Sequence, residues 1–230
     1  MIKLFLRKVN AKVRFKKHKK NNAELIYQKY KEFSMIPIQI YIDNLLLCDT
    51  INSIDGCIVE CGVWRGGMIA GIYDYVLKKR KSFLFDSFEG LPEVRENDGI
   101  AAKRWQEEND GVGLDNCKAE ILFAQEAMKR ANSENHDIIK GWFDITIPNT
   151  QISEPIAILR LDGDWYDSTM VCLENLYPLV AENGIIIIDD YYTWDGCSRA
   201  VHDYLSKNNL PLRISQTLNG VCYIKNTISS

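Results

Sequence analysis

The sequence predicts an α/β fold in which a mostly parallel sheet carries helices on both faces. The expected strands are apolar along their whole length, which indicates that both of their faces are buried. They alternate with helical segments of a length that suits crossovers between parallel strands. With 230 residues, 46% of them apolar, the chain is long enough to bury a sizeable core, and its composition excludes a disordered or collagen-like protein.

The first half of the chain alternates between helical and extended patterns. Helices are expected where apolar residues recur at helical spacing, and strands where short β-branched runs occur. Pro37 suits the first turn of a helix. In chain order we expect helices over 23–32 and 38–48, a strand over 54–60, a helix over 66–79, a strand over 82–86 and a helix over 114–131.

The second half continues the alternation and ends differently. We expect strands over 137–143 and 156–162, a helix over 168–180, a strand over 184–190 and a helix over 198–207. Two final strands, over 212–216 and 221–225, form a hairpin whose turn contains Asn219 and Gly220. This C-terminal hairpin is expected to add an antiparallel strand at one edge of the sheet.

The chain carries no internal repeat and no linker rich in Ser, Gly or Pro, which predicts a single domain over 22–230. Its first part, over 22–50, is helical. A polar insert over 93–112 separates the second strand from the helix that follows it. Long loops in compact domains often bind substrate, so two interpretations stay open: a substrate loop and a tolerated surface insertion.

Residues 1–21 form a basic leader ahead of an acidic domain. Nine of the 28 Lys and Arg residues lie within 1–20, which leaves 19 of them against all 31 acidic residues in the rest. The amphipathic pattern of the leader is typical of a helix on an anionic membrane surface. The alternative is that the leader packs on its own domain or on a second subunit. The overall net charge of -3 argues against a nucleic-acid-binding protein.

The seven cysteines form no Cys-x-x-Cys pair, and the chain has three scattered histidines, so a zinc site is not expected. Free thiols in a reducing compartment explain this pattern better than a disulfide framework. No apolar run is long enough for a membrane span, and no secretory signal is present. We therefore expect a cytoplasmic location.

A glycine-containing turn follows the first expected strand. After Glu60 the glycines Gly62, Gly66 and Gly67 allow close backbone approach to a ligand at the start of a helix. They do not complete a dinucleotide fingerprint, and a tight turn alone would need glycine. Asp86 ends the next strand, where an acid can accept hydrogen bonds from both ribose hydroxyls. Together the turn and the acid favour a nucleoside without a pyrophosphate.

Four acids follow two neighbouring strands of the second half: Asp162, Asp164, Asp189 and Asp190. The carboxyl ends of parallel strands lie at one edge of a sheet, so these carboxylates are expected to converge and repel each other. A divalent cation would relieve the repulsion. An all-oxygen donor set favours Mg²⁺, leaves Ca²⁺ and Mn²⁺ open, and disfavours Zn²⁺ and Cu²⁺. Each acid alone could cap a helix instead. Successive strand residues face opposite ways, so both members of the last pair can bind the ion only where the chain turns.

Three tryptophans, Trp142, Trp165 and Trp194, come just after expected strands. At these positions their rings could wall an adenine or sugar pocket, and packing in the core explains large aromatics equally well. Both interpretations stay open from the sequence.

Several segments resemble the macrocin O-methyltransferase (TylF-type) family. They are Glu60–Gly67, Phe85–Pro92, Gly141–Phe143 with Pro148, Leu159–Tyr166 and Ile188–Tyr191, and the resemblance runs from about residue 35 to residue 223. It implies a Rossmann-like class I methyltransferase fold that uses S-adenosylmethionine and Mg²⁺ to methylate a sugar hydroxyl.

The resemblance also implies a role for each site residue. Residues 22–50 would form the N-terminal lid region, Asp86 would hold the ribose, and Ser87 and Trp142 would lie near the adenine. Asp164 would be the general base. The residues along the methionine part of the cofactor would be Glu60, Gly62, Val63, Trp64, Arg65 and Gly66, and the metal ligands would be Asp162, Asp189 and Asp190.

The expected function is methylation of a sugar or glycoside hydroxyl, in natural-product or surface-glycan biosynthesis. One alternative is a catechol-type O-methyltransferase, because a phenolic vicinal diol also presents two neighbouring oxygens. A second is a non-catalytic protein on the same fold that binds membranes through residues 1–20 at the inner membrane face. A small-molecule sugar is the expected partner, nucleic acid is not, and a homo-oligomer is left open.

Overall fold

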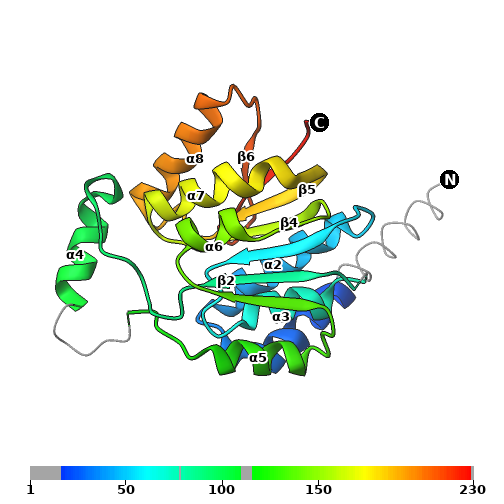
Figure 1. The fold of residues 1–230 in the computed structure, drawn as a ribbon. Helices are drawn as coiled ribbons and strands as arrows, with labels where there is room; N and C mark the ends of the chain where they lie inside the picture. Colours follow the sequence, from blue (N-terminus) through cyan, green and yellow to red (C-terminus); the bar gives the residue numbers. More distant parts are fainter. Residues whose placement is uncertain (1–16, 78, 110–115, 229–230) are drawn as a thin grey trace.

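The computed structural model describes residues 17–77, 79–109 and 116–228 (Figure 1). Their central sheet has seven strands in the order β3-β2-β1-β4-β5-β7-β6. The first five in this order are parallel, and β7 pairs antiparallel with both β5 and β6. The strands are β1 (Cys57–Cys61), β2 (Ser82–Asp86), β3 (His136–Lys140), β4 (Ile156–Leu161), β5 (Val180–Ile188), β6 (Ile214–Gln216) and β7 (Cys222–Lys225). The predicted α/β fold with its antiparallel edge pair is confirmed.

Helices cover both faces of this sheet (Figure 1). One face, which carries Ile58 and Leu84, packs against the helix over 17–30 and against α2, α3 and α5. The other, which carries Val59 and Phe85, packs against α6, α7 and α8. The helices are α2 (Ile38–Cys48), α3 (Gly67–Tyr75), α4 (Gly99–Asn109), α5 (Ile121–Arg130), α6 (Phe143–Asn149), α7 (Tyr166–Leu176) and α8 (Asp195–Lys207), with short 3-10 turns at Lys31–Phe33, Asp49–Ile51, Glu96–Asp98 and Tyr177–Leu179.

The strand order reverses between β1 and β4. From β1 the chain proceeds outward through β2 to β3, and then returns to place β4 on the other side of β1. The carboxyl ends of β1 and β4 therefore flank the crevice where open α/β sheets bind ligands. Gly62 lies at this point with a φ of +86°, and a Cβ there would stand 1.7 Å from the carbonyl oxygen of Asp162. The close approach of the two strand ends therefore itself requires glycine.

Several segments differ in their bounds from the sequence-based expectation, and three of the differences lie close to the carboxyl ends of the strands. The insert predicted as a loop over 93–112 contains a 3-10 turn and the helix α4, and this helix stands apart from the sheet in Figure 1. The strand expected over 137–143 ends at Lys140, and a helix that was not expected, α6, begins at Phe143. Finally, β5 begins at Val180 and ends at Ile188, before the two aspartates. A short or largely polar helix shows little apolar periodicity in its sequence. Contacts with other parts of the fold therefore determine whether such a segment becomes helical.

The described part of the leader packs on the domain. Residues 17–30 form one helix that passes through the expected boundary at 21–22 without a break. Lys19 forms an ion pair with Asp49, and the Tyr75 hydroxyl lies 3.5 Å from the Lys19 carbonyl oxygen. Residues 1–16, on which most of the membrane-surface interpretation rests, lie outside the described residues, so that interpretation stays a prediction.

Two expected absences can be checked in the described residues. Six of the seven cysteines are buried and form no disulfide, and Cys117 is half-buried. None of the described helices combines the length and the apolar character that crossing a bilayer would require.

Candidate functional site

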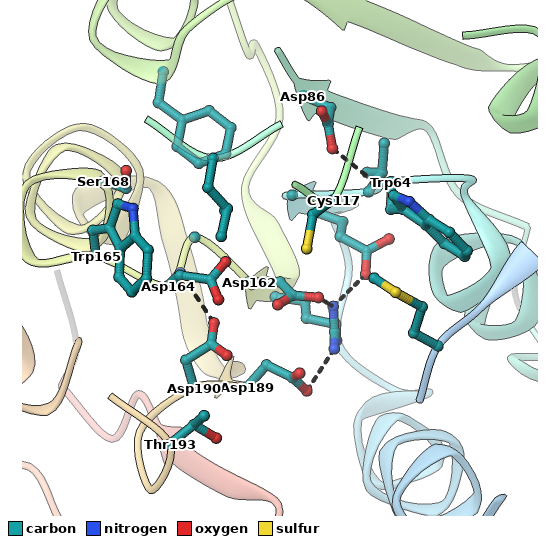
Figure 2. Close-up of a pocket in the computed structure, with 18 of the residues that line it drawn as sticks. Trp64, Asp86, Cys117, Asp162, Asp164, Trp165, Ser168, Asp189, Asp190 and Thr193 are labelled. Carbon is teal, nitrogen blue, oxygen red and sulfur yellow. Dashed lines mark hydrogen bonds and ion pairs between the residues drawn. The ribbon is translucent and has the colours of Figure 1, made fainter. Parts of the chain in front are cut away.

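A cavity of about 1100 Å³ opens at the carboxyl ends of β1, β2, β4 and β5. Figure 2 shows Asp86 and Trp64 on one side of it and the aspartate cluster on the other. Ligand pockets of single small molecules commonly occupy about 300–1,000 Å³. The cavity is therefore large enough for two ligands side by side.

Asp86 is held rigidly at the tip of β2. Its Oδ2 accepts a hydrogen bond from the Trp64 backbone N–H at 2.8 Å, and its Oδ1 accepts one from the Phe88 N–H at 2.6 Å. Burial raises the pKa of this carboxyl, and the neighbouring backbone N–H groups of Phe88, Trp64 and Val63 act against that rise. A carboxylate oxygen can accept more than one hydrogen bond, so both oxygens of Asp86 remain able to bind ligand hydroxyls.

Only part of the glycine-containing turn after β1 lines the cavity. Arg65 lies between two rings, with its guanidinium carbon 4.3 Å from the Trp64 centroid and 4.6 Å from the Phe123 centroid. Neither Arg65 nor Gly66 is among the described residues that line the cavity. The expected cofactor residues of this segment that do line it are Glu60, Gly62, Val63 and Trp64.

Ser87 and Trp142 present different surfaces to the cavity. The Ser87 hydroxyl donates to the Gly90 carbonyl and accepts from the Glu89 N–H, both at 3.0 Å, so it is engaged within its own turn. Trp142 immediately precedes α6, and 37% of it is exposed at the cavity. Its ring is available to stack against a flat ligand group.

The aspartates come from the loops after β4 and β5 and all line the cavity (Figure 2). Asp162 directly follows β4, whereas Asp189 and Asp190 lie in a turn directly after Ile188. Because the chain turns there, the two side chains do not have to point to opposite faces, as successive residues of a regular strand do. Both neighbouring carboxylates therefore reach the same cavity.

Arg160 lies behind this cluster, and sequence reasoning missed it. Its fully buried guanidinium lies 2.7 Å from a Glu60 oxygen, 2.8 Å from an Asp162 oxygen and 2.5 Å from an Asp189 oxygen. Glu60 and Arg160 are direct partners in the register of β1 and β4. An arginine within an otherwise apolar strand beside a cluster of acids was the signal that could have revealed it, since buried charges need partners. Arg160 thus supplies part of the positive charge that the acids require.

Three of the four aspartates bring carboxylate oxygens together. Asp162, Asp164 and Asp190 each offer an oxygen, and these oxygens lie within 4.8 Å of one another. Burial, and next the charge of Asp162, raise the pKa of Asp164 to about 7. Burial, and next the charge of Asp164, raise the pKa of Asp190 well above its usual value. An all-oxygen cluster of this kind fits a Mg²⁺ ion, whose charge would relieve the repulsion.

The expected metal set and the observed cluster overlap in part. Asp162 and Asp190 belong to both, whereas Asp189 faces Arg160 and Asp164 occupies the third position of the cluster. The Asp164 backbone N–H donates to Asp190 Oδ2 at 3.1 Å, which ties the two loops together.

Two of the three tryptophans noted in the sequence join a third, Trp105 of α4. The ring centroids of Trp165 and Trp194 are 5.2 Å apart, and each lies 6.0 Å from that of Trp105, all in edge-to-face geometry. Trp165 also lines the cavity. These rings therefore pack the polar insert against the loops that carry the acids, and we call them the tryptophan triad.

Asp98 forms a second attachment of the insert. It is 2% exposed, and its Oδ1 accepts the Tyr166 N–H at 2.7 Å, at the first residue of α7. Its Oδ2 accepts the Arg95 N–H, also at 2.7 Å. A carboxylate from a distant segment thus satisfies a free N–H of the first turn of α7.

Replacing Asp98 with alanine should lower the free energy of unfolding by about 1–3 kcal/mol, because two backbone N–H groups lose their acceptor. In a chain of this size, each kcal/mol corresponds to a fall in Tm of about 2–4 °C, which circular dichroism can measure. The matched Asp98→Asn variant keeps one acceptor oxygen and should lose less. An Asp98→Ala variant with the same Tm as the wild type would show that this carboxylate does not anchor the insert.

Comparison with known proteins identifies related sequences along most of the chain. A family model described as macrocin O-methyltransferase (TylF) matches residues 12–225. Demethyldecarbamoylnovobiocin O-methyltransferase of Streptomyces niveus is 36% identical over 180 residues, which cover 72% of this chain and 65% of that protein. A tetracenomycin-type rhamnosyl 4′-O-methyltransferase of Streptomyces olivaceus is 35% identical over 190 residues, which cover 76% of this chain and 69% of that protein. The matched segment thus spans about two thirds of the length of these relatives.

Solved structures agree with this fold. The structure of the O-methyltransferase NovP has a TM-score of 0.71 at 30% identity, covering 85% of this chain and 83% of that one. The calicheamicin methyltransferase CalS11 has a TM-score of 0.59 at 19% identity, covering 89% of this chain and 91% of that one, and shows likeness of fold alone.

Proposed function

Because the chain belongs to the macrocin O-methyltransferase (TylF) family, we propose that it transfers the methyl group of S-adenosylmethionine to a hydroxyl of a sugar or glycoside. The observation that carries this proposal is one cavity with two chemically distinct ends. At one end Asp86 offers an anchored carboxylate, and at the other Asp162, Asp164 and Asp190 converge.

S-adenosylmethionine would occupy the end of the cavity that contains Asp86. Asp86 would accept hydrogen bonds from the two ribose hydroxyls, and the exposed face of Trp142 would lie near the adenine. Glu60 lines the cavity, and its buried Oε2 has no hydrogen-bond partner among the described residues. An unsatisfied carboxylate oxygen is costly in a buried site, and the ammonium group of the cofactor is a partner of the right charge.

The opposite end of the cavity would hold Mg²⁺ through Asp162, Asp189 and Asp190. When bound, a divalent cation lowers the pKa of a neighbouring acceptor hydroxyl and orients it toward the methyl group. Arg160 keeps the carboxylates of Asp162 and Asp189 close together, because both pair with its buried guanidinium. The chain's own charges therefore hold two of these ligands side by side.

Asp164 would receive the proton of the reacting hydroxyl. Alcohols are poor nucleophiles at neutral pH, so a nearby carboxylate that accepts the proton accelerates the transfer. When bound, S-adenosylmethionine would supply the methyl group: the carbon–oxygen bond would form as the sulfur–carbon bond breaks, giving a methyl ether and S-adenosylhomocysteine, and Asp164 would take up the hydroxyl proton. Asp164 has a φ of +57°, an uncommon conformation for a residue other than glycine and one that is concentrated at functional sites.

A methyl-transfer screen tests the proposal. The protein is incubated with S-adenosylmethionine, Mg²⁺ and panels of nucleotide-linked sugars, lipid-linked sugars and glycosylated natural products, and release of S-adenosylhomocysteine is measured. Turnover of at least one sugar is the expected result. Turnover confined to catechols in a parallel panel would favour the catechol-type alternative. Calorimetry that detects no binding of S-adenosylmethionine would favour the non-catalytic one.

A further inference from the structure

Trp194 donates a hydrogen bond to the carboxylate proposed to receive the proton. Its indole Nε1 lies 2.8 Å from Asp164 Oδ1, and hydrogen bonds to carboxylates are among the stronger ones in proteins. In the part of the chain that the structure describes, this is the hydrogen bond that the Asp164 side chain makes. The Trp194 backbone N–H also donates to the Asp190 carbonyl at 3.0 Å. The turn that contains the acids after β5 therefore also supplies the donor to Asp164.

The backbone of Asp164 is already constrained, and its side chain is less so. The residue is in the left-handed region, and its N–H is bonded to Asp190 Oδ2. These contacts leave the carboxylate able to rotate about its side-chain torsions. A donor at one oxygen removes much of that freedom and leaves the second oxygen available toward the cavity.

The indole of Trp194 is itself held in place by the tryptophan triad. Its ring contacts Trp165 and Trp105 edge to face, and such pairs have preferred geometries. Trp165 is anchored in turn, because its Nε1 donates to the Pro92 carbonyl at 3.0 Å, next to the insert. The polar insert thus contributes a ring that restricts where the indole N–H can point.

We propose that Trp194 is a positioning residue, which holds the Asp164 carboxylate where the proton of the acceptor hydroxyl is received. This inference rests on the proposed function of the site. It also gives the insert a role that differs from both a substrate loop and a tolerated insertion, because α4 supports the donor through Trp105.

Two substitutions of Trp194 separate hydrogen bonding from packing. Trp194→Phe keeps an aromatic ring and removes the donor. Trp194→His can place Nε2 as many bonds from Cβ as the indole Nε1, and it lacks the six-membered ring that contributes to the triad. A purely structural role predicts that phenylalanine is the milder change, whereas a positioning role predicts that histidine is milder for turnover.

Trp194→Phe is expected to lower kcat about 10- to 100-fold, the range that follows from small misplacement of a reacting group. Its affinity for S-adenosylhomocysteine, measured by calorimetry, should stay at the wild-type value, since Trp194 does not line the cavity. Trp194→His should show a lower Tm than Trp194→Phe and a higher kcat. Wild-type kcat in Trp194→Phe, or a lower kcat in Trp194→His than in Trp194→Phe, would overturn the inference.

A crystal structure of Trp194→Phe supplies a readout that needs no turnover. The Asp164 carboxylate is expected to rotate away from its wild-type position while Asp162 and Asp190 keep theirs. An unchanged carboxylate would overturn the inference even where the histidine variant does not fold. A wild-type protein that methylates no sugar would instead contradict the proposed function, and this crystallographic comparison would still decide the role of Trp194.

Discussion

Asp164→Asn is expected to lower kcat for methyl transfer by about 10²–10⁴-fold, the usual contribution of a positioned general base. Asparagine keeps the size of the side chain and an oxygen that can accept the Trp194 indole N–H, which is 2.8 Å away in the wild type. It loses the negative charge and therefore the ability to take up the hydroxyl proton. Steady-state release of S-adenosylhomocysteine measures the effect, and calorimetry should show that the cofactor product still binds.

Asp86→Ala is the matched control for this prediction. It removes the proposed acceptor for the ribose hydroxyls at the other end of the cavity, so affinity for S-adenosylhomocysteine should fall about 10-fold or more. The two variants should therefore fail in different measurements, one in turnover and the other in binding. Full activity in Asp164→Asn would contradict its assignment as the base.

Removal of divalent cations should abolish methyl transfer, and adding Mg²⁺ in excess of the chelator should restore it. The oxygens of three carboxylates lie within 4.8 Å of one another, an arrangement that burial makes unfavourable unless a cation offsets the negative charge. Activity after treatment with EDTA, followed by dialysis and back-titration with Mg²⁺, measures the effect. Turnover that is insensitive to the chelator would contradict the metal assignment.

Calorimetric titration of Mg²⁺ into single variants identifies the ligands. Asp162→Asn, Asp189→Asn and Asp190→Asn should each weaken Mg²⁺ binding about 10-fold or more, in keeping with the loss of a charged ligand. Asp164→Asn is the informative comparison, because Asp164 lies in the observed cluster and Asp189 pairs with Arg160. Normal Mg²⁺ affinity in Asp189→Asn, together with its loss in Asp164→Asn, would exchange the roles of these two residues.

Much of the fold could be predicted because the signals are local. The strand β2 was predicted at its observed bounds, and the apolar runs around Ile58 and Ile186 predicted strands buried on both faces. The antiparallel edge pair followed from an Asn-Gly turn between two short extended runs. The helix α4, which is largely polar, and the helix α6, which has only seven residues, were missed because their stability comes from contacts outside the segment.

The candidate site was predicted in outline from residue types at strand ends. Asp86, Asp162 and Asp190 were identified because the carboxyl ends of parallel strands share one edge of the sheet. Asp98 and Trp105 were not identified, since an acid and an aromatic ring within a polar segment are common on protein surfaces. Their roles depend on Tyr166 and on the other two rings of the triad.

The sequence by itself determined the α/β architecture, the acid at the tip of β2 and the convergence of carboxylates, because periodicity and strand-end position are properties of short segments. Only the tertiary structure decided which charges pair. Glu60 and Arg160 are 100 residues apart in the chain and form an ion pair because β1 and β4 are neighbours in register. It likewise decided that α4 packs against Trp194. Electrostatic and aromatic contacts act through space, so their partners become known only once the chain has brought distant segments together.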